Sequence, residues 1–108
     1  MYNRMQAEQE VLGSILINPR YAPFILNRLY LSDFHGKRNR AIFRAITALS
    51  GQSVEANPAA VLGELRKFGI TEETLSGDDL RRLMDITPTA AGVEESIQQL
   101  ERERRVAL

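Results

Sequence analysis

The segment RNRAIFRAITALSG, residues 38–51, decides the fold class, because its apolar residues follow the period of an α-helix. The apolar positions recur at intervals of three and four and therefore share one face of a helix: Ile42, Ala45, Ile46 and Leu49. The segment predicts an amphipathic helix that packs this face against other helices.

Most of the remaining chain shows the same period, and no stretch alternates as a half-buried strand does. Further helices are expected over residues 6–17, from about 21 to about 30, over 58–68, after a cap at Ser76, and from about 93 onward. We therefore predict an all-α fold, a compact orthogonal bundle of five to six short helices, with residues 1–108 forming a single domain.

Helix ends and buried positions follow from local signals. Gly51 and Gly69 are expected just beyond helix C-termini, and Thr89 or Gly92 at the start of the last helix. The second helix is expected to bury Phe24. The expected structural core consists of Leu12, Ile15, Leu16, Phe34, Ile42, Phe43, Ile46, Leu65, Leu80, Leu83, Ile97 and Leu100.

Composition excludes several classes of protein. The chain has no cysteine, so it contains neither a disulfide nor a thiolate metal site. It has no long apolar run and no signal peptide at its start, so we expect no membrane contact and a cytoplasmic location.

The net charge is zero, but the charges are unevenly distributed. Residues 1–50 carry seven Lys or Arg against three acids, so the remaining residues carry the compensating negative charge. This asymmetry suits self-association or protein partners with complementary faces at least as well as it suits DNA.

Candidate catalytic groups are few. His35 is the only histidine, and a surface or packing role is the simpler interpretation of it. The dipeptide Gly36-Lys37 lacks the earlier glycine and the following Ser or Thr of a phosphate-binding loop. The acid pairs at 72–73, 78–79 and 94–95 favour helix capping and solvation over metal binding. We therefore expect no catalytic residue, no metal ligand and no cofactor.

The basic segment HGKRNRAIFR, residues 35–44, leaves two interpretations open. Arg40 and Arg44 are spaced i, i+4 and could follow phosphates or an acidic protein surface. The alternative is a solvated face opposite the apolar stripe, which we favour because a stacking stripe of aromatic residues is missing.

The last helix changes character along its length. Val93, Ile97 and Leu100 have the spacing needed to dock on a bundle, whereas residues 101–105 are all charged. We expect residues from about 93 to 108 to lead toward a linker or helical hairpin, with residues 101–105 leaving the bundle. Val106 and Leu108 would begin an apolar stripe that this chain does not cover.

Three segments in the same order resemble one family. They read EQEVLGSIL (residues 8–16), DFHGKRNRAIFRAI (33–46) and TPTAAGVEESIQQL (87–100). Together they are similar to the N-terminal domain of the bacterial replicative DNA helicases, the DnaB family. His35, Asn39, Asp79 and Gly92 depart from the residues usual in that family, so the chain resembles a divergent member.

The resemblance implies an all-helical, non-catalytic domain that helps a hexameric ring to assemble and docks primase and, in some systems, a helicase loader during DNA replication. ATP binding, hydrolysis and DNA contact belong to the parent protein. The isolated chain is expected to self-associate only weakly. The alternative function is a small autonomous nucleic-acid-binding domain that uses residues 37–44. The candidate interaction residues are Lys37, Arg38, Arg40, Arg44, Glu101, Arg104 and Arg105.

Overall fold

The computed structural model of the chain describes residues 3–87 and 92–106. In these ranges it contains six α-helices and two short 3₁₀ helices, which confirms the all-α class. The α-helices are α1 (Arg4–Ile17), α2 (Ala22–Leu26), α3 (Lys37–Gly51), α4 (Pro58–Lys67), α5 (Gly77–Ile86) and α6 (Val93–Val106); the 3₁₀ helices are η1 (Pro19–Tyr21) and η2 (Leu31–Asp33).

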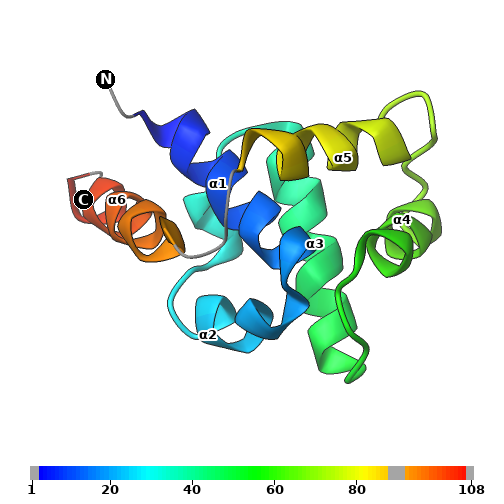
Figure 1. The fold of residues 1–108 in the computed structure, drawn as a ribbon, viewed down its shortest axis with the longest axis horizontal. Helices are drawn as coiled ribbons and strands as arrows, with labels where there is room; N and C mark the ends of the chain where they lie inside the picture. The colour runs from blue at the N-terminus through cyan, green and yellow to red at the C-terminus, as the bar shows by residue number, and fades with distance from the viewer. Residues whose placement is uncertain (1–2, 88–91, 107–108) are drawn as a thin grey trace.

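Helix α1 lies at the centre of the bundle (Figure 1). It packs against α3, α5 and α6, while α4 packs on α3 and α5. In Figure 1, α5 crosses the top of the view, α4 lies at the right, α6 at the left and α2 at the bottom. The buried apolar side chains of these helices form one cluster, and every residue of the expected core is buried in it.

The close crossing of α1 and α5 depends on a glycine. A Cβ atom added at Gly13 would lie 2.2 Å from Thr87 Oγ1 and 2.6 Å from the backbone oxygen of Leu83. Thr87 is fixed there because its hydroxyl donates a hydrogen bond to that same oxygen at 2.9 Å. Only a residue without a side chain lets the two helices approach so closely.

Two helix ends show how a Schellman ending forms with and without glycine. After α4, Gly69 has a positive φ of 83°, and Ile70 N–H donates to Leu65 O, as expected from the sequence. The prediction that Gly51 lies just beyond the end of α3 was wrong. Gly51 is still helical, and Ser53 takes the positive φ of 58° while Val54 N–H donates to Leu49 O.

The second helix is shorter than expected. Helix α2 ends at Leu26 rather than near Tyr30, and the chain then turns before η2. Ile25 and Leu29 are buried, but Phe24 is 44 % exposed, which contradicts its expected burial. In so short a helix the buried face is narrow, and Phe24 instead lies beneath the guanidinium of Arg28 at 5.5 Å. The expected Thr89 start of α6 and Leu108 lie outside the described residues.

Candidate functional site

A buried carboxylate joins the start of α3 to α1. Glu8 is fully buried, and its carboxylate accepts hydrogen bonds from His35 N–H at 2.9 Å, Gly36 N–H at 3.3 Å and the side-chain amide of Asn39 at 3.1 Å. The negative charge lies at the N-terminal end of α3, where the helix dipole favours it. Glu8 therefore holds the loop that begins α3 and is a structural residue.

Helix α6 is joined to the α2–η2 turn by an arginine that binds two glutamates. Arg28 Nη1 lies 2.6 Å from Glu94 Oε1, and Arg28 Nη2 lies 2.6 Å from Glu101 Oε1. Glu94 and Glu101 are two helical turns apart on α6, so one guanidinium spans them. The hydrogen bond from Arg28 lowers the pKa of Glu94 below its ordinary value.

A second arginine binds the same turn from the end of α6. Arg104 makes a two-pronged contact with Asp33, through Nε to Oδ1 at 2.9 Å and through Nη2 to Oδ2 at 2.7 Å. Its Nη2 also donates to the backbone oxygen of Arg28, and its guanidinium lies 4.7 Å from the centre of the Tyr30 ring. Burial acts to raise the pKa of Asp33, but hydrogen bonds from Arg104 and from Tyr30 N–H outweigh it and lower the pKa below the ordinary value.

This pKa shift predicts acid sensitivity of the α6 attachment. Because the folded pKa of Asp33 lies below its ordinary value of 3.8, the ion pair stabilises the fold above that pH and is lost as the pH falls below it. In Asp33→Asn this contribution is absent at every pH. We expect the difference in free energy of unfolding between wild type and Asp33→Asn to shrink from pH 7 to about pH 3, as measured by urea denaturation. A difference that stays constant with pH would contradict the assigned role of Asp33.

These contacts revise the expectation for the C-terminal segment. Residues 101–105 were expected to leave the bundle, but Glu101 and Arg104 bind Arg28 and Asp33, and Glu103 pairs with Arg4 at 3.1 Å. Among the candidate interaction residues of α6, Arg105 is the exposed one. Val106 is 84 % exposed at the end of the described helix, and Leu108 lies outside the described residues, so the apolar stripe stays a prediction.

The basic segment does not form one patch. Arg40 Nε donates to the backbone oxygen of Phe34 at 3.1 Å, and the guanidinium of Arg44 lies 4.0 Å from the centre of the Phe68 ring. Arg38 lines a hollow on another side of α3, and Lys37 is exposed at the first position of that helix. Arg40 and Arg44 are both exposed while each also contacts the fold, so their role toward phosphates or an acidic protein surface stays a prediction.

The hollow beside Arg38, here called the Arg38 hollow, lies between α1, α3 and α5. Its volume is about 390 Å³, and its lining includes Gln9, Arg38, Ile42, Asp79, Arg82 and Ile86. Ile86 is 51 % exposed at its edge. Asp79 belongs to the Ser76 capping box, and the hydrogen bond from Ser76 N–H lowers the pKa of Asp79. Asp79 also pairs with Arg82 at 3.3 Å, so Arg38 is the basic residue of this lining whose charge is left in excess.

A second hollow, here called the Arg44 groove, lies between the α2–η2 turn and α3. Its volume is about 470 Å³, and its lining includes Leu26, Tyr30, Leu31, Phe43, Arg44 and Phe68. Tyr30 is 62 % exposed and Leu31 is 40 % exposed. The lining contains one basic residue and no acidic residue.

The candidate catalytic groups of the sequence do not meet in one site. His35 is exposed, and within residues 3–87 and 92–106 no three His, Asp or Glu side chains are grouped as metal ligands would be. Among the acid pairs, Glu94 binds Arg28, and Asp78 lies 3.7 Å from Arg81. No described helix is long and apolar enough to span a membrane.

Sequence reasoning missed the residues that organise this surface. Glu8, Arg28 and Asp33 were not among the candidates, although Glu8 joins α1 to the loop before α3 and the other two join the α2–η2 region to α6. One signal was available for Glu8, because it shares the helical face of Val11, Leu12 and Ile15 and is the charged residue of that stripe. Pairs such as Arg28–Glu101 join residues far apart in the chain and have no comparable local signal.

The fold defines a small all-α domain of six short helices, with hollows between the helices that are lined by apolar and charged side chains. The chain belongs to the DnaB-like helicase N-terminal domain family, which it matches over residues 1–102. It is 36 % identical over 90 residues to the replicative DNA helicase DnaB of Rhodothermus marinus and 31 % identical over 87 residues to that of Mycobacterium leprae. These matches cover 83 % and 81 % of this chain.

A solved structure agrees with this assignment. The crystal structure of the N-terminal domain of DnaB helicase from Mycobacterium tuberculosis matches with a TM-score of 0.80 and 29 % identity, over 87 % of this chain and 65 % of that chain. The matched region is 10 % of the R. marinus helicase and 14 % of the M. leprae helicase. The chain thus corresponds to the N-terminal domain of a replicative helicase.

Proposed function

We propose that this chain is a non-catalytic assembly and docking domain of a replicative DNA helicase, which supports the ring and binds primase or a loader. The observation that carries the proposal is the family match over residues 1–102 together with the fold that it shares with a solved helicase domain. The chain acts as one domain, and its parent protein supplies ATP hydrolysis and DNA contact.

The Arg38 hollow is the surface that we assign to the docked partner. Ile86, which is 51 % exposed, offers apolar contact, and Arg38 lines the hollow together with the Asp79–Arg82 ion pair. Lys37 is the first residue of α3, next to Arg38, and adds positive charge at this end of the helix. A partner helix with apolar residues on one face and carboxylates beside them matches this chemistry.

Helix α6 connects the bundle, which docks the partner protein, to the segment through which subunits assemble. Its ion pairs with Arg28, Asp33 and Arg4 keep it against the bundle as far as Arg104. Beyond that point Arg105 and Val106 are exposed. We propose that residues 93–108 lead toward a linker or helical hairpin through which subunits pair, as the family resemblance implies.

The test of the docking role is binding of the isolated chain to the C-terminal domain of the cognate primase. Arg38→Glu and Ile86→Glu should each weaken binding about tenfold, because one reverses a rim charge and the other removes an exposed apolar contact. Arg105→Glu is the matched charge control, since Arg105 does not line the hollow. Equal affinities of the wild type and the three variants for the primase domain would contradict the assignment of this surface.

A further inference from the structure

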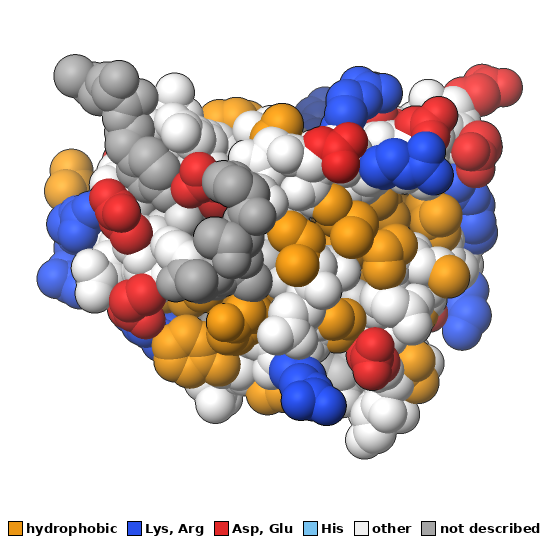
Figure 2. All heavy atoms as spheres, viewed as in Figure 1, with side chains coloured by type: hydrophobic (Ala, Val, Ile, Leu, Met, Phe, Trp, Pro, Cys, Tyr) orange, Lys and Arg blue, Asp and Glu red, His pale blue; other side chains and the backbone are white. Residues whose placement is uncertain are grey.

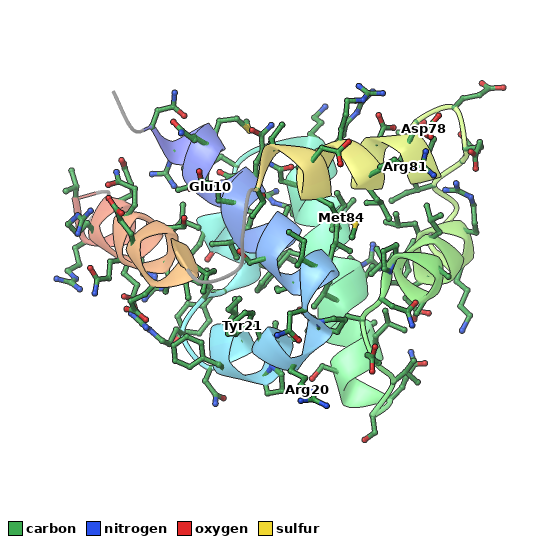
Figure 3. The ribbon with its side chains drawn as sticks, in the orientation of Figure 1. Glu10, Arg20, Tyr21, Asp78, Arg81 and Met84 are labelled. Atoms are coloured by element: carbon green, nitrogen blue, oxygen red, sulfur yellow. The ribbon has the colours of Figure 1, made fainter. Side chains whose placement is uncertain are left out.

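Helix α6 is held against the bundle in two different ways along its length. Its first two turns bury Val93, Ile97 and Leu100. Ser96 donates a hydrogen bond to Glu10 at 2.9 Å, and Figure 3 shows Glu10 on α1. Beyond Leu100, no described side chain of the helix is buried. The first part of α6 is therefore anchored by apolar burial, and the rest of the described helix is not.

Ion pairs with other elements hold residues 101–106, here called the α6 end. They are Arg28–Glu101 at 2.6 Å, Arg104–Asp33 at 2.7 Å and Arg4–Glu103 at 3.1 Å, and together they are here called the ionic clasp. The clasp reaches α1, the turn after α2, and η2. Figure 2 shows basic and acidic side chains next to one another at the left of the view, where Figure 1 places α6.

The charges of the clasp can separate without leaving a buried charge unpaired. Arg28 also binds Glu94 at 2.6 Å, so it keeps a carboxylate when Glu101 moves away. The side chain of Asp33 is 2 % exposed beneath Arg104, and water would reach it once that arginine has left. The cost of a buried unpaired charge, which makes many buried ion pairs hard to break, is therefore avoided here.

We infer that the ionic clasp is a conformational switch, which holds the α6 end against the bundle when closed and lets it separate after Leu100 when open. Ion pairs between partly exposed groups weaken as salt screens them, whereas apolar burial does not depend on charge. Released from the clasp, a single turn or two of helix has little stability of its own. The first part of α6 stays docked in both states.

The clasp thus sets the direction in which the last turns of α6 leave the bundle. Each of its pairs includes a side chain that is at least 22 % exposed, so dissolved ions reach all of them. Salt, or a charged partner that competes for these side chains, would open it. The inference goes beyond the proposed docking function and does not depend on it, because the clasp lies within this chain.

Distances between two spin labels test the switch. The chain has no cysteine, so two introduced cysteines take the labels at chosen positions. One label is placed at Ser50→Cys near the end of α3, and the other at Arg105→Cys in the α6 end. A second protein carries Glu95→Cys, in the first turn of α6, in place of Arg105→Cys. The three positions are exposed and lie outside the clasp. Double electron–electron resonance gives the distance distributions.

The Debye length falls from about 30 Å in 0.01 M salt to about 3 Å in 1 M salt. Over this range we expect the ratio of closed to open molecules, measured with the label at residue 105, to fall about tenfold, because three ion pairs are weakened together. The distance to the label at residue 95 should stay the same, because the apolar contacts of the first two turns persist.

Arg104→Gln should open the clasp even in low salt, because its two-pronged contact with Asp33 is lost. Arg102→Gln is the matched control. It removes the same charge from the α6 end, but Arg102 is exposed and its guanidinium binds Gln99 of the same helix. This control should give the wild-type distances.

Three results would overturn the inference. The first is a distance to residue 105 that changes neither with salt nor in Arg104→Gln. The second is an equal change at residues 95 and 105, which would mean that the whole helix leaves the bundle. The third is equal opening in Arg102→Gln and Arg104→Gln, which would mean that the positive charge of the α6 end matters and the contact with Asp33 does not.

Discussion

Replacing Gly13 by alanine should lower the free energy of unfolding by about 3 kcal/mol, because a new Cβ would overlap a backbone atom as well as a side chain. The side chain of Thr87 could rotate away, but Leu83 O belongs to the backbone of α5, 2.6 Å from the Cβ position. Helix α5 must therefore move away from α1 and open the core that they share. Urea denaturation followed by far-UV circular dichroism measures the loss.

Gly63→Ala is the matched control for this variant. Gly63 lies within α4, and a Cβ atom there would meet nothing within 4 Å. Alanine also has the higher helix propensity, so this change should stabilise the fold by up to about 1 kcal/mol. If Gly13→Ala were as stable as Gly63→Ala, the close approach of α1 and α5 would not be as the structure has it.

Removal of the Glu8 carboxylate should cost about 3 kcal/mol of stability, because its donors would lose their acceptor in a buried place. In Glu8→Ala the N–H groups of His35 and Gly36 and the amide of Asn39 are left without this partner. The start of α3 should loosen as a result. Faster hydrogen exchange at the first turn of α3 than at its last turn would show that the effect is local.

Two variants separate the role of Glu8 from simple loss of charge. Glu8→Gln keeps one acceptor oxygen, so we expect it to lose less stability than Glu8→Ala but more than an exposed control. Glu73→Ala is that control, because Glu73 is exposed in the loop before α5 and should change stability by less than about 0.5 kcal/mol. Equal stability of Glu8→Ala and Glu73→Ala would contradict the claim that the buried Glu8 carboxylate stabilises the fold.

The sequence predicts the helices of this fold well because the apolar stripe of each long helix is a local pattern. Ile42, Ile46 and Leu49 are spaced as one helical face and are buried as one face. The Ser76 capping box and the Schellman ending at Gly69 are equally local, since each uses residues within six positions. The three family segments then identify the arrangement by resemblance.

The wrong predictions concern positions where two nearby residues fit the local pattern and the tertiary fold decides which of them takes the role. Gly51 and Ser53 both follow the stripe of α3, and the helix continues through the glycine to end near a serine with positive φ. Phe24 and Ile25 are adjacent in a short helix, but of the two only Ile25 is buried in the core. At the end of α3 the tertiary fold overrides the intrinsic preference of glycine for a positive φ, and in α2 it decides between two apolar residues.

For the candidate interaction residues too, the local sequence indicates the charge of a residue but not what it contacts in the fold. Glu101 and Arg104 read as a free charged surface in sequence, but the bundle places Arg28 and Asp33 beside them. Arg38 and Arg44 are close in sequence, but they line different hollows because residues six apart on a helix lie on different faces. Which charges remain available to a partner is thus decided by the tertiary fold.

The central claim, that this chain is a docking domain of a replicative helicase, is tested most directly by heteronuclear NMR. The labelled chain is titrated with the unlabelled C-terminal domain of the cognate primase. We predict saturable shifts that cluster at Arg38, Arg82 and Ile86, around the Arg38 hollow. Spectra that do not change at about 0.5 mM primase domain, or shifts without such a cluster, would contradict it.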